Sequence, residues 1–228
     1  MKTLRIAIPV LFAAIFALSL AITPAMAEAA RPNPVPVTDT AIVPLDATEI
    51  ADLQFMREEE KLARDVYITL YDVWGVAVFN NISRSEQSHM DAVLTLLDRY
   101  DIADPVGDNG VGEFTDPDLQ TLYDELVAVG SASLSDALLV GGAIEEIDIL
   151  DLDEAVAETE HADIQQVYAR LLNGSYNHLR AFTRTLTQQT GEVYEPQYMD
   201  ADAYSAIVDA ASSNGSSNGR SRGGRRGR

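Results

Sequence analysis

Histidine and carboxylate side chains occur where amphipathic helices are expected to bury apolar residues. Glu86 and His89 stand three residues apart in the segment Ser85–Met90. This spacing places both side chains on one helix face, because residues three apart are neighbours there. A buried carboxylate or imidazole is costly unless it has a partner. A metal ion is one such partner, and oxygen and imidazole ligands without sulfur suit iron or manganese, with zinc or copper as alternatives.

An acidic run in the first long helix supplies a second candidate. Within Glu58-Glu59-Glu60, only Glu59 falls at the centre of the apolar stripe that includes Leu62 and Val66. At about 100° per residue, Glu58 is expected to face solvent and Glu60 to lie at the stripe's edge. Glu59 is therefore the candidate ligand from this helix.

Two further expected helices also place polar groups on their apolar stripes. Glu145 and Asp148 lie on one, whereas Glu146 points the opposite way, and His178 lies on the other. Carboxylates from several helices would bridge two ions about 3.5–4 Å apart in a dinuclear site. The candidate ligands are Glu59, Glu86, His89, Glu145, Asp148 and His178.

Each candidate also has a structural explanation. Glu86 follows Ser83 by three residues and would complete a capping box if the helix began late. His89 and His178 would serve equally as hydrogen-bonded core histidines, and the whole set as a buried network without metal. His161, near the start of an expected helix, is interpreted as a surface residue.

The elements that must position these groups are helices. Asp46 with Glu49 and Asp116 with Pro117 are typical N-terminal caps, and Gly191 is a typical C-terminal stop. Long helices are expected from Asp46 to about Trp74 and over 80–100, 135–152 and 159–190, with short helices over 117–129 and 201–211. No strand-like alternation occurs, so the fold class is all-α, with four apolar stripes forming a bundle.

Two features of these helices lead to further expectations. The outer face of the first helix is expected to carry solvent-exposed ion pairs among Arg57, Lys61, Arg64 and Asp65. The pair Gly141-Gly142 lies one turn before Glu145, and we hypothesise that it opens space for a ligand. The alternative is close helix packing.

Composition restricts the partners. The formal charge is −20, and residues 28–213 hold all 36 acidic residues against nine basic ones. Such a body disfavours nucleic acid and anionic membranes, which argues against nucleic-acid binding by the arginine-rich end of the chain. Cysteine is absent, which excludes disulfides and thiolate ligands.

The ends of the chain differ from its centre. Residues 1–27 read as a signal peptide, with Lys2 and Arg5, an apolar run over 6–22 and an Ala25-Met26-Ala27 cleavage site. An uncleaved anchor is the alternative, although the run is short for a bilayer and contains Pro9. Residues 28–47 read as an extended lead-in, 48–211 as the helical domain and 212–228 as a disordered Arg/Gly/Ser-rich tail. A secreted, periplasmic or cell-envelope protein without a membrane span in its mature form is expected.

Four blocks of the sequence resemble a bacterial and archaeal family. They are Met56–Tyr67, Ser85–Met90, Gly142–Ile149 and Gly174–Phe182. The chain is similar over residues 48–190 to the family called domain of unknown function 2202, which is itself similar to the ferritin-like superfamily. The resemblance implies a ferritin-like antiparallel four-helix bundle. It implies no established activity.

The ferritin-like pattern has a lone Glu on each of two helices and Glu-x-x-His on each of the other two. By this resemblance Glu59 and Glu145 match the lone residues, and Glu86 with His89 matches one pair. Ser175 occupies the position three before His178, so the second pair lacks its carboxylate, which Asp148 would supply from the third long helix.

The expected function is thus an exported bundle that binds one or two divalent metal ions, with iron as the expected cofactor and manganese or zinc as alternatives. Metal-centred redox activity is a hypothesis, and no catalytic residue and no oligomeric state are assigned. The alternative is a non-catalytic envelope interaction module with a purely structural Glu/His network.

Overall fold

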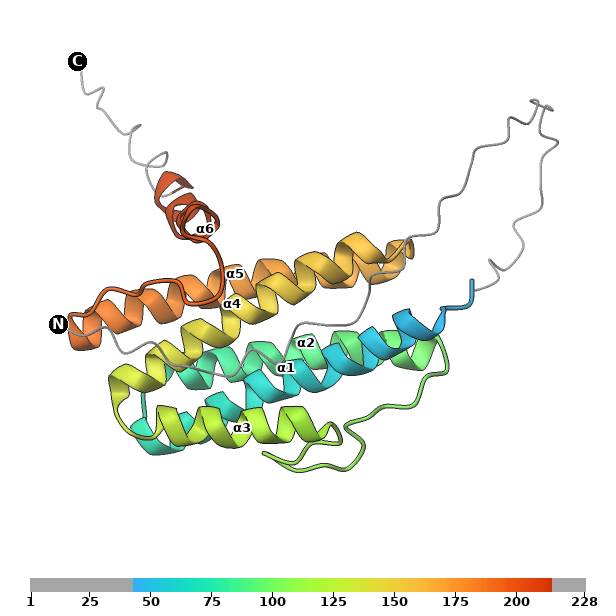
Figure 1. Ribbon diagram of the computed structural model, residues 1–228, viewed down its shortest axis with the longest axis horizontal. Coiled ribbons are helices and arrows are strands. Elements are labelled where there is room, and N and C mark those ends of the chain that lie inside the picture. Colours follow the sequence, from blue (N-terminus) through green and yellow to red (C-terminus); the bar gives the residue numbers. More distant parts are fainter. Residues whose placement is uncertain (1–42, 215–228) are drawn as a thin grey trace, which may run out of the picture.

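The computed structural model describes residues 43–214. The expected signal segment, nearly all of the lead-in and residues 215–228 of the tail lie outside this range. The described chain is all-helical, with six helices and no strand (Figure 1). The helices are α1 (Ala47–Trp74), α2 (Ala77–Arg99), α3 (Pro117–Gly130), α4 (Leu134–Glu158), α5 (Ala162–Thr190) and α6 (Ala201–Asn214). Over residues 43–214, no helix combines the length and the apolar composition that a membrane span needs.

The helix ends follow local capping chemistry. The Asp46 side chain accepts from the backbone N–H groups of Thr48 and Glu49, and the Glu49 side chain accepts from the Asp46 N–H, which completes a capping box. Asp116 caps α3 ahead of Pro117. Gly191 ends α5 at φ 78, a left-handed conformation that glycine adopts without steric penalty. All three caps were predicted from the sequence.

Three helices extend beyond the sequence-based prediction, and one of them, α6, continues to Asn214 into the predicted tail. α2 begins at Ala77 instead of residue 80, so Ser83 lies inside the helix and its hydroxyl donates to the Asn80 carbonyl. Glu86 is therefore not part of a capping box. α4 continues past Leu152 to Glu158, and this additional stretch matters for the acidic end of the molecule described below.

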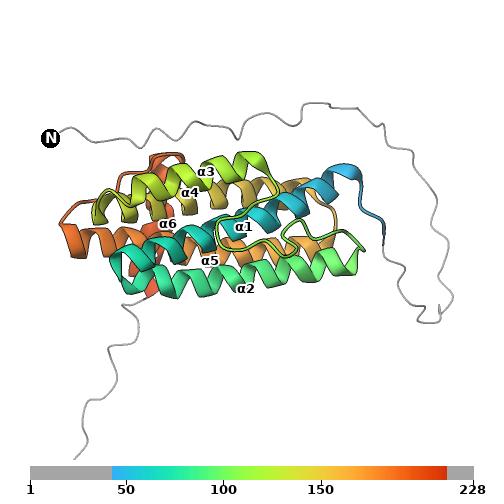
Figure 2. The same cartoon turned by 90° about the horizontal axis from the view of Figure 1, so that it is seen from below.

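The four long helices lie side by side (Figures 1 and 2). α1 packs mainly on α2 and α4 mainly on α5, and the two pairs meet where α1 faces α4 and α2 faces α5. The Trp74 indole donates to the Gly130 carbonyl at 2.9 Å, which joins the ends of α1 and α3. Since α4 starts just after α3, it begins at the same end as α2 and runs in the same direction. α3 covers α1 and α4, and α6 lies against α5.

Two apolar clusters fill the interior, one on each side of a polar layer. The larger cluster includes Val66, Phe79 and Phe182, and the smaller includes Leu53, Val93 and Leu171. Along α1, α2 and α5 the polar residues occupy the interval between the two clusters, and on α4 Glu145 and Asp148 lie between Ile144 and Ile149 of the larger cluster. The candidate ligands therefore lie in a layer midway along the bundle, with apolar packing above and below it.

The outer face of α1 differs from the prediction of exposed ion pairs. Arg57, Lys61 and Asp65 are all buried, because residues 101–116 fold over this face. Arg57 forms a bidentate pair with Asp104 at 3.0–3.1 Å, and Lys61 pairs with Asp65 and donates to the Gly110 carbonyl. Helical periodicity cannot reveal this cover, because it comes from a loop about 50 residues further along the chain.

Glu58 and Glu146 are likewise buried, although solvent-facing positions were predicted for them. Glu58 accepts from the Thr115 and Asp116 N–H groups at 2.6 and 3.0 Å. Glu146 accepts from the Tyr194 hydroxyl at 2.5 Å and from three successive backbone N–H groups at residues 197–199. Each carboxylate fixes a loop over its helix.

The hypothesis that Gly141-Gly142 opens ligand space is wrong. A Cβ atom at Gly141 would lie 2.5 Å from the Phe182 ring, and one at Gly142 would lie 2.3 Å from the Tyr194 ring. Both glycines allow aromatic rings to pack directly on the backbone of α4. The space is occupied by this packing.

Candidate metal centre

Each long helix contributes to the polar layer. The residues are Glu60 from α1, Glu86 and His89 from α2, Glu145 and Asp148 from α4, and Ser175 and His178 from α5. All are buried, with His89 the most exposed at 9%. Such a concentration of ionisable groups is stable only if the charges pair with one another or with a bound ion.

Glu86 lies at the centre of this layer. Its Oε2 is 2.8 Å from His89 Nδ1, and its Oε1 is 2.8 Å from His178 Nδ1. The two imidazole rings stack at a centroid distance of 5.4 Å and an interplanar angle of 28°. One carboxylate from α2 thus connects two imidazoles that come from different helices.

A second carboxylate flanks each histidine. Glu60 Oε2 lies 3.1 Å from His89 Nδ1, and Glu145 Oε2 lies 3.4 Å from His178 Nδ1. The arrangement is approximately symmetric about Glu86: one imidazole and one outer carboxylate on either side. Each Nδ1 faces two carboxylate oxygens from different residues, which is a suitable donor set for a cation.

Outer hydrogen bonds hold the ligand candidates in place. The Tyr67 hydroxyl donates to Glu145 Oε1 at 2.6 Å, and His178 Nε2 lies 2.9 Å from the Ser85 hydroxyl. A hydrogen bond at one ring nitrogen fixes the ring orientation and leaves the other nitrogen facing the site. Gly174 lets the His89 ring lie directly against α5, because a Cβ there would be 2.5 Å from His89 Nε2.

Asp148 and Ser175 complete the layer. The Ser175 hydroxyl is hydrogen-bonded to Asp148 Oδ2 and lies 3.0 Å from the Leu171 carbonyl. Asp148 Oδ1 has no hydrogen-bond partner among the described residues. A carboxylate from α4 thus lies beside the α5 position where the sequence has serine.

The charges in this layer shift the pKa values of its members strongly. Burial alone lowers the pKa of His89, but the neighbouring Glu60 and Glu86 carboxylates outweigh it and raise this pKa to about 11. Likewise Glu145 and Glu86 overcome burial and raise the pKa of His178 to about 10. Burial raises the pKa of Glu86, but the two histidines bring it down to about 2. Without metal, the two imidazoles are the cations of the site.

The residues fit a metal ion. Glu86, His89 and His178 offer one ligand atom each within 4.8 Å of one another, and within the described chain this is the one such group of three. The close contact between His178 Nδ1 and Glu86 Oε1 lacks hydrogen-bond geometry, and Glu60 Oε1 is also unpartnered. A metal ion would use these free ligand atoms and displace the imidazole protons.

Glu59 does not join this group, contrary to the sequence-based prediction that it rather than Glu60 faces the site. Glu60 contacts His89, whereas Glu59 lies near Asp148 and Asp151 on α4. Burial and these two carboxylates raise the pKa of Glu59 well above its usual value. Helical periodicity defines the middle of the α1 stripe, but only packing determines which edge faces α2 and which faces α4. The sequence contained no signal for this choice.

His161 is half-buried instead of exposed. Its Nε2 lies 3.5 Å from Glu49 Oε2 and its Nδ1 lies 3.4 Å from the Tyr100 hydroxyl. It belongs to the end of the bundle, far along α5 from His178, and takes no part in the polar layer.

This chain is similar in sequence and fold to known proteins. Residues 49–211 match the family model described as "Uncharacterized protein domain (DUF2202)". An uncharacterized protein of Methanocaldococcus jannaschii, MJ0754, is 46% identical over 172 residues, which cover 75% of this chain and 92% of the relative. The crystal structure of hypothetical protein MJ0754 from Methanococcus jannaschii matches with a TM-score of 0.72 at 46% identity, covering 75% of this chain and 98% of that one. The chain therefore belongs to the DUF2202 family.

Proposed function

We propose that this protein is a ferritin-like four-helix bundle that binds two divalent metal ions in its polar layer. The observation that carries the proposal is the position of Glu86, whose two oxygens each contact the Nδ1 atom of a different histidine at 2.8 Å. Structural ion pairs need only one carboxylate per histidine. Here three carboxylates surround two imidazoles, and several buried ligand atoms remain unpartnered.

The chain path supports the ferritin-like assignment. A bundle of this type has one long crossover connection. Here the segment between α2 and α4 returns along the bundle, so that these two helices run in the same direction while α1–α2 and α4–α5 are joined by short turns. One Glu comes from α1, one from α4 and a Glu-x-x-His pair from α2, as in the ferritin-like pattern. α5 supplies only His178, because Ser175 stands at the carboxylate position of the second pair.

The ligands divide into two sets. His89 with Glu60 would hold one ion, and His178 with Glu145 would hold the other, with Glu86 shared between them. Asp148 would replace the carboxylate that α5 lacks at Ser175. Carboxylate oxygens with imidazole nitrogens favour iron or manganese, and zinc remains an alternative.

A bound iron or manganese pair would supply one-electron redox chemistry. The chain's own residues prepare the site for it: Tyr67 orients Glu145, Ser85 orients His178, and the two apolar clusters limit water access from both ends of the layer. Nucleophilic catalysis is not part of the proposal. We also propose export to the cell envelope or beyond, on the basis of the signal-like composition of residues 1–27.

A structural network without metal is the second candidate. It is favoured by the fact that both histidines already pair with carboxylates at 2.8 Å, so that imidazolium cations balance part of the negative charge. In this case the polar layer would specify helix register, and the protein would act as a non-catalytic interaction module.

Metal content separates the two candidates. Purified protein is reconstituted with iron, manganese or zinc and measured by mass spectrometry, with Glu86→Ala/His89→Ala and the isosteric Glu86→Gln beside it. Asp98→Ala, an exposed acid on the same helix, is the matched control. We expect the two ions of the polar layer in the wild type and control, and a lower metal content in the site variants, which lose the ions held at Glu86. Wild-type protein that stays metal-free while fully helical by circular dichroism would refute the metal proposal.

A further inference from the structure

A pocket of about 420 Å³ opens at the end of the bundle where α1 begins, α4 ends and α5 begins. Its lining is strongly acidic, with Asp46, Glu49, Asp52, Glu158 and Glu160 among its residues. None of the described residues that line it is lysine or arginine, and His161 is its one basic group. Cations are attracted to a recess of this charge, because low-dielectric walls focus the field of the carboxylates.

Carboxylates continue from this pocket along α4 toward the centre. Glu158 lines the pocket, and Asp151, Asp148 and Glu145 follow at intervals of seven, three and three residues. This spacing keeps them on one side of the helix. At about 1.5 Å per residue, the distance from Glu158 to Glu145 is roughly 20 Å. The α4 side chains therefore connect the pocket with the polar layer.

Glu59 lies midway along this route. It is 5% exposed, it is within hydrogen-bonding reach of Asp151, and its Oε2 has no partner among the described residues. Asp148 Oδ1 and Asp151 Oδ2 are also unpartnered. Three carboxylates from two helices thus converge with free oxygens, and no described cation neutralises them. Such an all-oxygen set suits a hard divalent cation.

The Tyr168 hydroxyl lies between the pocket and this group. Tyr168 lines the pocket, is 2% exposed, and has an unpartnered hydroxyl. Burial raises the pKa of this hydroxyl, and the nearby carboxylates of Asp52 and Glu59 raise it further. A buried polar atom without a partner is unusual, and this one lies among the carboxylates that connect the pocket with Glu59.

We propose that Glu59 and Asp151 form a second, all-oxygen cation site, through which divalent ions captured in the acidic pocket pass to the Glu86–His89–His178 centre. Delivery to the centre rests on the proposed metal-binding function. The existence of the Glu59–Asp151 site is independent of that function, because it is tested in a variant whose Glu86–His89–His178 centre is disabled. Asp148 links the two sites, because it lies near Glu59 and in the polar layer at once.

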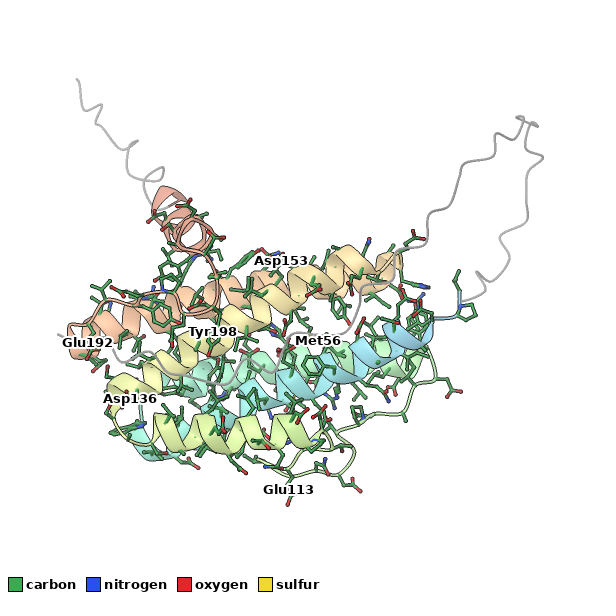
Figure 3. The ribbon with its side chains drawn as sticks, viewed as in Figure 1. Met56, Glu113, Asp136, Asp153, Glu192 and Tyr198 are labelled. Carbon is green, nitrogen blue, oxygen red and sulfur yellow. The ribbon has the colours of Figure 1, made fainter. Side chains whose placement is uncertain are left out.

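The first experiment isolates the second site. Mn²⁺ binding is followed by electron paramagnetic resonance in Glu86→Ala/His89→Ala, and again after adding Glu59→Gln/Asp151→Asn. As a control, Asp153→Asn/Glu192→Gln is added to Glu86→Ala/His89→Ala instead, because these two acids are exposed on the surface (Figure 3). We expect about one Mn²⁺ per chain to persist in the first variant and the control. It should be lost when Glu59 and Asp151 are neutralised. No retained ion in the first variant would overturn the proposal.

The second experiment tests delivery in the otherwise wild-type protein. Co²⁺ is mixed rapidly with the protein, and its imidazole-dependent visible band reports filling of the His centre. Glu59→Gln/Asp151→Asn should reach the same band intensity about tenfold more slowly, because a focusing carboxylate pair has been removed. Filling at the wild-type rate would overturn the delivery role. Absence of the band in the wild type, with Mn²⁺ still retained in the first experiment, would refute the His centre and leave the second site standing.

Discussion

Gly174 allows a specific test of the centre, because it is the point where α5 approaches the His89 ring. A Cβ atom at this position would lie 2.5 Å from His89 Nε2 and 2.6 Å from Cε1, but 3.7 Å from His178 Cε1. Gly174→Ala must therefore push the His89 ring away by about 1 Å to reach ordinary contact, while His178 can stay in place. The substitution perturbs one half of the centre selectively.

The magnitude follows from the two contacts that His89 Nδ1 makes. It lies 2.8 Å from Glu86 and 3.1 Å from Glu60, and a shift of this size would take Nδ1 out of its present geometry with both carboxylates. Misplacing a ligand in this way typically weakens metal binding about 10- to 100-fold. The folded protein without metal would lose a charged contact worth about 1.5–3 kcal/mol. It would regain about 0.5–1 kcal/mol from replacing a helical glycine.

The assay is Mn²⁺ titration by competition with a chelating dye, together with thermal unfolding of the metal-free protein. Asn173→Ala, an exposed neighbour on the same helix, controls for helix propensity. We expect Gly174→Ala to lower the affinity for one of the two Mn²⁺ ions and to lower the melting temperature by a few degrees. Wild-type affinity for both ions in Gly174→Ala would refute the assignment of His89 as a ligand.

Three further predictions concern the surroundings of the centre. Glu146→Gln should lower the free energy of unfolding in urea by about 2–3 kcal/mol, since this carboxylate accepts from Tyr194 and three backbone N–H groups; an unchanged urea midpoint would contradict its role in holding residues 194–199. Lys61→Met should cost about 1.5–3 kcal/mol by chemical denaturation, because the buried Asp65 loses one of its two cationic partners and keeps only Arg64; an unchanged free energy of unfolding would show that Arg64 alone compensates the charge of Asp65. Burial, followed by the charge of Glu158, raises the pKa of Asp52 to about 6. The folded state therefore binds more protons than the unfolded state between about pH 4 and 6, and stability falls as pH rises through that window. Asp52→Asn should stabilise the protein at pH 7 by about 1 kcal/mol after allowance for its partial exposure, and should have little effect near pH 3.5. A variant whose melting temperature equals that of the wild type at both pH values would contradict this.

The helices and several members of the centre were predictable from the sequence because they depend on local rules. The Glu86–His89 spacing defines one helix face whatever that face packs against. His178 lies among apolar residues at helical spacing, and its position facing α2 follows from burial of the α5 stripe. The caps at Asp46 and Asp116 are likewise local chemistry.

The errors in side-chain placement involve partners distant in sequence. Glu60 instead of Glu59 lies beside His89, because α2 packs on one edge of the α1 stripe and α4 packs on the other. The two edges are only one residue apart along the helix. Lys61 is buried by the loop over residues 101–116, and its ammonium group donates to the Gly110 carbonyl of that loop. Gly141 is packed by Phe182 on α5. Periodicity shows how much of a helix is buried, but not which neighbour buries each side.

The most direct test of the central claim is a crystal structure of the protein soaked in Mn²⁺, with anomalous diffraction to locate the ions. We predict anomalous peaks on either side of the Glu86 carboxylate, one at His89 Nδ1 and one at His178 Nδ1. An empty polar layer, with both histidines still paired to Glu86, would contradict the account and identify the layer as a structural network.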